Sequence, residues 1–266
     1  MKTLAIARFI NVGHRGAAAY APENTIASFE EAITRKADMI EFDLRRTIDG
    51  SVVAFHDRYI KLSNGRKKAV SKVRIGELGR AIAHIGADLA LFEEILIKFG
   101  RRIPLNIEIK IGGIEREVLF LLKKYPPAFE PTISSFYPWI LKRYKRLDRN
   151  LKIALILGQE KIRKINFLAR PMVDKLVSGL GIKAIHLQET IVSRAVVDTL
   201  TRLGVSILVW TVDDPEKMRK LVKLGVDGII TNKPDILYKI CSEMSLHEKP
   251  ILHRVNGNMG RFAYTR

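Results

Sequence analysis

Eight short apolar runs, each bounded by turn residues, recur along this chain and alternate with segments of helical periodicity. We interpret these runs as strands, at residues 8–12, 38–44, 103–109, 132–135, 151–157, 183–187, 206–211 and 227–231. Strands that alternate with helices form a parallel sheet covered by helices, because parallel strands need a crossover connection. Eight such strands in about 250 residues predict a closed (β/α)₈ TIM barrel, with a doubly wound open sheet as the alternative.

The segments between the strands carry apolar residues at helical spacing. In residues 22–36, Ile26, Phe29 and Ile33 share one helix face, and Pro22 suits a first turn. Further helices are expected at residues 114–124, 137–146, 190–203, 215–224 and 234–244. Each one follows a predicted strand, as the barrel requires.

Three segments do not fit the alternation. An Asp49-Gly50 turn leads into a short strand at 51–56, which predicts a hairpin at the top of the barrel. Residues 57–86 are polar and basic, and we interpret them as an inserted loop. The expected organisation is one barrel at 1–241 with this insertion, followed by a polar tail at 242–266 to which no pattern assigns a structure.

Charge and cysteine content limit the protein class. The 266 residues include 46 basic and 28 acidic side chains, a net charge of +18, and Cys241 is the single cysteine. No intrachain disulfide can form, and no apolar run reaches the ~20 residues of a membrane helix. The start shows no targeting pattern, which favours a cytoplasmic protein. The positive charge indicates either an anionic partner, including transient contact with a membrane surface, or a solvated basic exterior.

Carboxylates collect at the ends of the second and third predicted strands. Glu41 and Asp43 lie two residues apart and share one strand face, as do Glu108 and Lys110. A barrel packs its apolar side chains against the outer helices, so these polar ones point to the axis at the active-site end. Three converging acids need neutralisation, and their oxygens suit Mg²⁺ or Ca²⁺, with Mn²⁺ also possible. In the alternative, they only pair with Arg15 and Lys110.

Two histidines are brought to the same rim. His14 and Arg15 follow the first strand, and His56 ends the strand of the predicted hairpin. Two imidazoles beside a carboxylate cluster are typical of an acid and a base that titrate near neutral pH. Arg15 and Lys110 are cationic donors for phosphate oxygens, so the whole set indicates phosphoryl chemistry.

Further motifs accompany these residues in a fixed order. They are His14-Arg15-Gly16, Ala21-Pro22-Glu23-Asn24-Thr25, Glu41-Phe42-Asp43, Asp49-Gly50, His56-Asp57, Asn106-Ile107-Glu108-Ile109-Lys110, Ser135-Phe136, Trp210-Thr211-Val212 and the run from Gly225 to Pro234. This string resembles the glycerophosphodiester phosphodiesterase family over positions 12 to about 240. The resemblance implies a phosphodiesterase-type TIM barrel that hydrolyses a small-molecule glycerophosphodiester to glycerol 3-phosphate and an alcohol.

The resemblance also implies a role for each site residue. It implies Glu41, Asp43 and Glu108 as ligands of the divalent metal, His14 and His56 as the acid and base, Arg15 and Lys110 as phosphate-binding residues, Glu23 as the residue that orients Arg15 or His14, and Trp210 with Phe136 as the pocket wall. The family's mechanism uses the neighbouring hydroxyl of the substrate as nucleophile and passes through a cyclic phosphate. An intramolecular attack of this kind gains its orientation cheaply.

Two departures from the family pattern stand out. Leu62-Ser63-Asn64-Gly65 replaces a threonine-rich turn in the insertion, which bears on substrate identity. Asn232 stands where an aspartate is more usual, and we expect it to alter a rim contact rather than the metal site. A third polar residue, His186, ends the sixth predicted strand, where a rim hydrogen bond is the simpler interpretation.

Two other functions fit parts of the sequence. A lysophospholipase D type activity on monoacyl lipids keeps the same chemistry. A non-catalytic barrel could bind anions or nucleic acid through its charge, and basic residues such as Lys142 and Arg146 lie beside Trp139. The complete acid, base and metal-ligand set argues against a non-catalytic barrel. Helical spacing makes those basic residues an exposed helix face, so a nucleic-acid partner is not expected.

Overall fold

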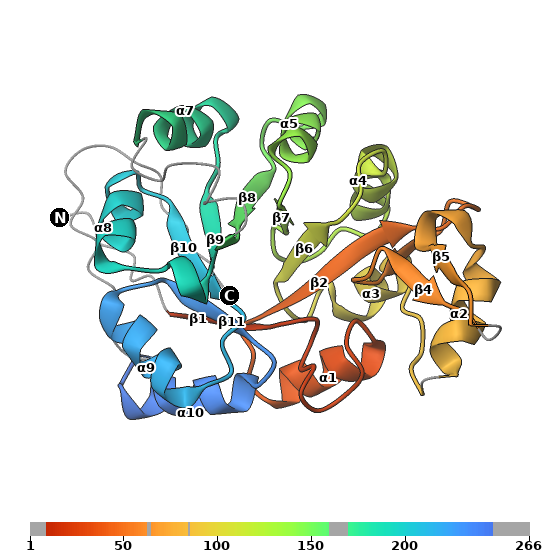
Figure 1. The fold of residues 1–266 in the computed structure, drawn as a ribbon, viewed down its shortest axis with the longest axis horizontal. Helices are drawn as coiled ribbons and strands as arrows, with labels where there is room; N and C mark the ends of the chain where they lie inside the picture. The colour runs from red at the N-terminus through yellow and green to blue at the C-terminus, as the bar shows by residue number, and fades with distance from the viewer. Residues whose placement is uncertain (1–8, 63–64, 85, 160–169, 247–266) are drawn as a thin grey trace.

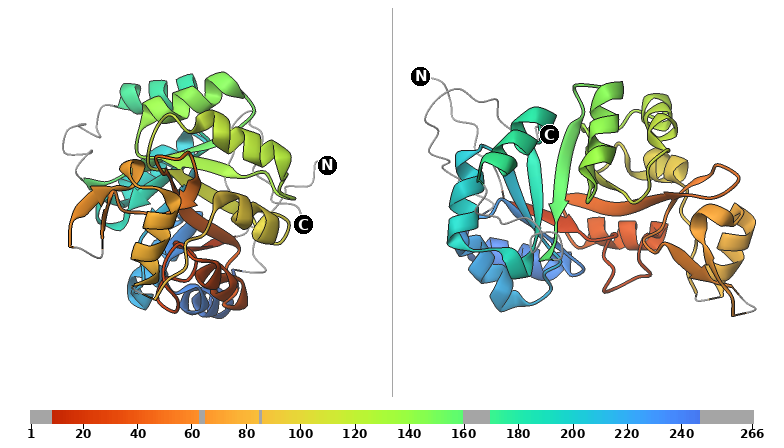
Figure 2. Two further views of the ribbon diagram at one scale, coloured as in Figure 1. Left: turned by 90° about the vertical axis from the view of Figure 1, so that its right-hand side faces the viewer. Right: turned by 45° about the horizontal axis from the view of Figure 1, so that its top comes forward.

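A closed barrel of eight parallel strands forms the body of the protein (Figures 1 and 2). The computed structural model describes residues 9–62, 65–84, 86–159 and 170–246. In order around the barrel, the strands are β1 (Ile10–Gly13), β2 (Met39–Arg46), β6 (Leu105–Ile109), β7 (Thr132–Ser135), β8 (Lys152–Leu157), β9 (Ala184–Gln188), β10 (Ser206–Trp210) and β11 (Gly228–Thr231). Because β1 pairs with both β2 and β11, the predicted TIM barrel is confirmed and the open-sheet alternative is wrong.

Helices follow the strands and cover the outside of the barrel (Figure 1). The helices at predicted positions are α1 (Ile26–Thr34), α4 (Glu115–Lys124), α5 (Pro138–Leu147), α8 (Arg194–Arg202), α9 (Pro215–Leu224) and α10 (Pro234–Glu243). The structure adds α3 (Phe92–Phe99) and α7 (Arg170–Leu180), which the sequence analysis did not predict.

Capping residues explain where several helices begin. Thr25 and Ser28 form a reciprocal capping box at the start of α1, each side chain accepting from the other's backbone N–H. The helix expected from residue 190 begins four residues later, because a 3₁₀ turn at Glu189–Ile191 comes first and the Ser193 side chain caps α8.

The main core lies between the strands and the outer helices. Alternate strand residues point outward, and Phe42 of β2 packs against Phe29 of α1 with ring centroids 5.6 Å apart. Phe99 of α3 meets the same Phe29 ring at 5.6 Å, edge to face. Full burial of such a ring stabilises the fold by about 2 kcal/mol relative to exposure. Inside the barrel, Met39 packs with Val12, Leu208 and Ile230.

The predicted hairpin and insertion follow β2. Strand β3 (Val52–Ala54) pairs antiparallel with the end of β2, which confirms the hairpin. The expected polar loop is instead folded: it contains β4 (Tyr59–Lys61), β5 (Lys67–Ala69), a 3₁₀ turn at Val70–Lys72 and α2 (Ile75–Ala83). These elements enclose a second small core of Val53, Ile60, Val70, Val73, Leu78, Ala81 and Ile82. The loop prediction was wrong. The segment has few apolar residues among many basic ones, so its small core left a weak pattern in the sequence, although the apolar residues of α2 have helical spacing.

Helix α10 is the last helix among the described residues. Helix α10 ends at Glu243, and residues 247–266, most of the predicted tail, lie outside the described residues. Within the described part of the chain, no helix combines the length and the apolar character needed to cross a membrane.

Candidate active site

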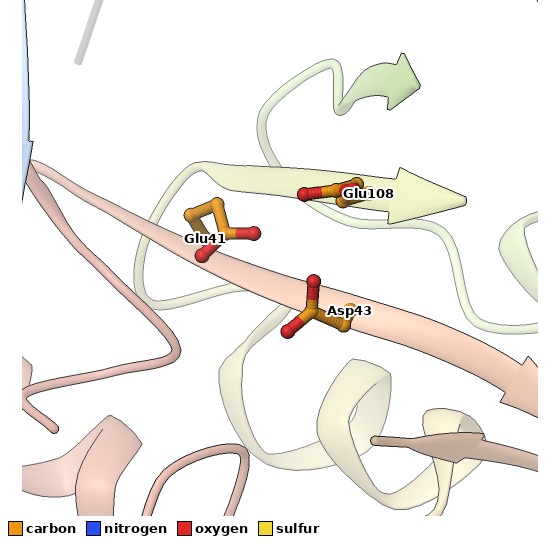
Figure 3. A group of neighbouring side chains, drawn as sticks. All are labelled: Glu41, Asp43 and Glu108. Atoms are coloured by element: carbon orange, nitrogen blue, oxygen red, sulfur yellow. The ribbon is translucent and has the colours of Figure 1, made fainter. Parts of the chain in front are cut away.

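The three predicted carboxylates meet at the carboxyl ends of two adjacent strands (Figure 3). Glu41 and Asp43 lie on β2, and the parallel register sets Asp43 beside Glu108 of β6. One oxygen from each carboxylate lies within 4.8 Å of the others, and all three side chains are buried. The expectation that these acids share one site at the barrel axis is therefore correct.

Two basic side chains neutralise part of this cluster. Lys110 Nζ lies 2.9 Å from Asp43 Oδ1 and also pairs with Glu108 Oε1, and Arg15 Nε lies 3.2 Å from Asp43 Oδ2. Burial by itself would raise the pKa of Asp43, but Lys110 and then Arg15 outweigh it and lower that pKa to about 2. The predicted pairing of the acids with Arg15 and Lys110 is therefore present for Asp43 and Glu108.

Glu41 is different. Its Oε2 accepts a hydrogen bond from the backbone N–H of Arg15 at 2.9 Å, but among the described residues no basic side chain forms an ion pair with it. Burial, followed by the charges of Asp43 and Glu108, raises the pKa of Glu41 well above its usual value. Three acids with two cationic partners and hard oxygen donors fit a divalent cation, which would supply the missing positive charge.

Asn24 holds Asp43 from the other side. Its Nδ2 donates to Asp43 Oδ2 at 2.9 Å, and its Oδ1 accepts from the backbone N–H of Asp43 at 3.1 Å. Asn24 has a φ of 59°, a left-handed conformation that asparagine tolerates better than most residues. In the sequence, Asn24 belongs to the motif at residues 21–25 but had no predicted role. Its place in that motif was the available signal.

The loop after β1 presents Arg15 to the site. Arg15 Nη1 donates to both oxygens of Glu23, at 2.8 and 2.7 Å, so Glu23 contacts Arg15, one of the two partners that the resemblance implied. Gly16 has a φ of 88°, and a Cβ atom there would overlap Ser28 of α1. Glycine therefore lets this loop turn tightly against the helix.

The two histidines occupy different surroundings. His14 Nδ1 lies 2.8 Å from Asn232 Oδ1, and burial, followed by the charge of Arg15, lowers the pKa of His14 to about 4. His56 is 35% exposed and its Nδ1 lies 2.8 Å from Asp57 Oδ1. Burial also lowers the pKa of His56, with Asp43 opposing the shift. Arg45, which the sequence analysis missed, donates from Nε to the backbone oxygen of His56 at 2.8 Å.

Two aromatic side chains lie together at the mouth. The rings of Phe136 and Trp210 are 5.5 Å apart and nearly perpendicular, and Lys110 Nζ lies 5.5 Å from the Phe136 centroid. Trp210 Nε1 donates to the backbone oxygen of His186 at 3.2 Å. The structure therefore brings both predicted wall residues together beside a predicted phosphate-binding residue.

His186 itself lies inside the barrel. Its side chain on β9 is 1% exposed, and neither ring nitrogen has a hydrogen-bond partner within the described residues. The predicted rim hydrogen bond is wrong, because β9 continues to Gln188, so His186 lies in the middle of the strand and its ring points inward below the rim. Burial lowers the pKa of His186 to about 3, so the ring is neutral near pH 7.

This fold and site define a class of enzyme. Acids suited to a hard cation, two imidazoles and two cationic donors at the carboxyl ends of barrel strands indicate a hydrolase of phosphate esters. The family model of the glycerophosphoryl diester phosphodiesterases matches residues 14–236, and the chain belongs to this family of phosphoric diester hydrolases.

Known proteins agree with this assignment. A glycerophosphodiester phosphodiesterase of Caldanaerobacter subterraneus is 30% identical over 253 residues, which cover 90% of this chain and 98% of that protein. The crystal structure of the glycerophosphodiester phosphodiesterase from Thermotoga maritima has a TM-score of 0.73 at 26% identity, covering 87% of this chain and 98% of that one. A phosphodiesterase of Oleispira antarctica, solved with the product sn-glycerol-3-phosphate, has a TM-score of 0.70 at 22% identity, covering 87% and 96%, and shares the fold.

Proposed function

We propose that the protein hydrolyses glycerophosphodiesters to glycerol 3-phosphate and an alcohol with the help of a divalent metal. The observation that carries this proposal is the buried cluster of Glu41, Asp43 and Glu108, in which two acids have cationic partners and Glu41 has none among the described residues. The donor set favours Mg²⁺ or Ca²⁺, and Mn²⁺ also fits it. A divalent ion held there supplies Lewis-acid stabilisation of charge on the phosphate oxygens.

Arg15 and Lys110 bind the phosphate in this proposal. Both are mostly buried beside the acids, with side chains 16% and 11% exposed, so their charges are only weakly screened. Glu23 holds the Arg15 guanidinium through Nη1, which fixes the direction of its remaining donors. Phe136 and Trp210 form an apolar wall beside Lys110 that excludes water from one side of the substrate.

His14 and His56 move the protons. One imidazole takes the proton of the glycerol hydroxyl next to the ester, and that oxygen attacks phosphorus to form a cyclic phosphate. The other histidine begins as an imidazolium and gives its proton to the oxygen of the departing alcohol, so charge and atoms balance. Water then opens the ring with the two roles reversed, which yields glycerol 3-phosphate. The nucleophile belongs to the substrate, so the chain supplies orientation and proton transfer but no nucleophile.

Metal removal combined with one substitution tests the cluster. We expect EDTA to abolish release of glycerol 3-phosphate from glycerophosphocholine and glycerophosphoethanolamine, and Mg²⁺, Ca²⁺ or Mn²⁺ to restore it. Glu41→Gln keeps the shape but removes the charge, and should lower turnover by at least ~10²-fold at saturating metal. Glu30→Gln, in an exposed ion pair with Arg102 on the barrel exterior, is the matched control. Full activity of Glu41→Gln with a normal circular dichroism spectrum would overturn the metal assignment.

The same assay separates the other candidate functions. Lysophosphatidylcholine in place of the deacylated substrate tests the lysophospholipase D type activity, and its preferential cleavage would replace the proposed substrate class. An oligonucleotide tests the anion-binding alternative. Salt-sensitive binding of nucleic acid without diesterase activity would contradict the proposal.

A further inference from the structure

Three neighbouring strand ends bring Asp213, Asn232 and His14 together. His14 and Asn232 are each the first residue after a barrel strand, β1 and β11, and these strands pair with Gly13 beside Thr231. The backbone N–H of His14 donates to the Thr231 oxygen at 2.8 Å, which continues the ladder to the rim. Asp213 follows β10, the neighbour of β11 on its other side.

Side-chain hydrogen bonds join these three residues in a row. His14 Nδ1 lies 2.8 Å from Asn232 Oδ1, and Asn232 Nδ2 donates to Asp213 Oδ2 at 2.6 Å. The other Asp213 oxygen, Oδ1, accepts from the Asn232 backbone N–H and from Thr231 Oγ1, both at 2.8 Å. Thr231 Oγ1 in turn accepts from the Lys233 backbone N–H at 3.0 Å. Both Asp213 oxygens are therefore anchored to the end of β11.

The Asp213 carboxylate determines which way the Asn232 amide faces. An ionised carboxylate only accepts hydrogen bonds, so the amide group 2.6 Å from Asp213 Oδ2 must be the NH₂. The reversed amide would place two acceptor oxygens at that distance. Asn232 therefore turns its oxygen to His14, and an amide oxygen also only accepts, so the proton of this contact sits on Nδ1 of His14.

We propose that Asp213 and Asn232 are positioning residues that hold neutral His14 with its proton on Nδ1, which leaves Nε2 as the nitrogen that accepts a proton. The tautomer follows from the hydrogen bonds alone, whereas the use of Nε2 in turnover rests on the proposed function. In the reacting step, the substrate O–H bond breaks and its proton goes to Nε2. The other proton stays on Nδ1 and continues to be donated to the Asn232 oxygen, and the resulting imidazolium later returns its Nε2 proton.

Other charges around His14 agree with this assignment. Burial disfavours a second proton on the His14 ring most strongly, and the charge of Arg15 adds to this effect. The Asn232 hydrogen bond and the charges of Asp43 and Glu23 oppose it, and the pKa of His14 falls to about 4. A neutral amide partner stabilises an imidazolium less than a carboxylate does. Between the neutral tautomers, the hydrogen bond at Nδ1 makes the choice.

The tautomer can be measured directly without turnover. In ¹⁵N-labelled full-length protein with Mg²⁺, the imidazole nitrogen shifts and their couplings to ring protons show which nitrogen carries hydrogen; His14→Gln assigns the signal. We expect Nδ1–H and bare Nε2 for His14 near pH 7. An Nε2–H tautomer in the wild-type protein would overturn the proposal, and this outcome needs no variant to fold.

Two variants then separate positioning from simple packing. Asn232→Leu keeps the volume but removes the acceptor; we expect a mixture of His14 tautomers, an unchanged His56 signal and a kcat about 10- to 100-fold lower, with a smaller change in KM. The exchange Asp213→Asn with Asn232→Asp conserves charge and donor count and should restore both the Nδ1–H tautomer and most of kcat. A pure Nδ1–H signal in Asn232→Leu would contradict the proposal. The expected tautomers without diesterase activity in the wild-type protein would instead contradict the proposed function and leave the positioning intact.

Discussion

The two imidazoles of the site are supported by two different parts of the molecule. His14 leaves a barrel strand directly and is held by Asn232, whose own side chain is tied to Asp213. His56 stands at the end of the hairpin strand β3, where the chain enters the insertion, and its partner Asp57 is 70% exposed. The barrel thus supplies a buried imidazole with a neutral partner, and the hairpin supplies a more exposed one with a charged partner. One site can in this way hold two histidines of different proton affinity.

The two regions also have separate cores that meet at β3. Val52 and Ala54 belong to the main core, whereas Val53 between them belongs to the small core of the insertion. Strand alternation sends neighbouring residues to opposite sides, so this three-residue strand couples the insertion to the barrel. In Figure 1 the insertion elements β4, β5 and α2 lie together at one end of the molecule, beyond the end of β2. The insertion is therefore a small folded unit that begins directly after His56.

Replacing each histidine gives the largest expected effect. We expect His14→Ala and His56→Ala each to lower kcat by ~10²-fold or more, because each removes a proton-transfer group. Steady-state release of glycerol 3-phosphate measures this effect, and His84→Ala, an exposed histidine of the insertion, is the control. If only one of the two site variants loses activity, the paired acid and base assignment is wrong.

A matched pair of leucines tests whether the cores are separate. Leu105 is buried in the main core and Leu78 in the insertion core. Leu105→Ala should lower the free energy of global unfolding by about 2–5 kcal/mol in urea, as large-to-small core substitutions do. Leu78→Ala should instead open the insertion locally, seen as new protease cleavage within 57–86 and reduced turnover, with a smaller shift of the urea midpoint. Equal midpoint shifts and no local cleavage would show one cooperative unit.

The smallest expected effect, per pH unit, is a pH dependence of the unfolding free energy that arises from His186 inside the barrel. Burial lowers the pKa of His186 to about 3, whereas the unfolded chain titrates near the ordinary value of 6.5. The unfolded state therefore binds a proton first, so this contribution to stability is complete above pH 6.5 and is lost as pH falls toward 3. Its slope reaches about 1.4 kcal/mol per pH unit.

Substitution of that histidine isolates the effect. His186→Gln should flatten the decline in urea-unfolding free energy between pH 6 and 4 relative to the wild-type protein, even if it lowers stability at pH 7. His84→Gln, in the insertion and exposed, should keep the wild-type slope. Identical slopes for all three proteins would mean that His186 acquires a proton in the folded barrel as easily as in the unfolded chain.

The sequence by itself determined the features that depend on local periodicity. Apolar runs located all eight barrel strands, and helical spacing located six of the helices between them. The two-residue spacing of Glu41 and Asp43 placed both acids on one inward face, because side chains alternate along any strand. The resemblance added Glu23, Phe136 and Trp210. In the structure, Glu23 contacts Arg15, and the rings of Phe136 and Trp210 pack against each other with Phe136 near Lys110.

Only the tertiary structure decided the features that depend on register between distant segments. The contact of His14 with Asn232 spans 218 positions and exists because β1 closes the barrel against β11. Asn24 reaches Asp43 from the loop before α1. His186 does not form the predicted rim hydrogen bond with any described residue, because its ring lies inside the barrel. The insertion became a folded unit because its few apolar side chains gather in space. Local sequence restricts the direction of a side chain, but its partners are set by which strands lie side by side, and that is decided when the whole barrel closes.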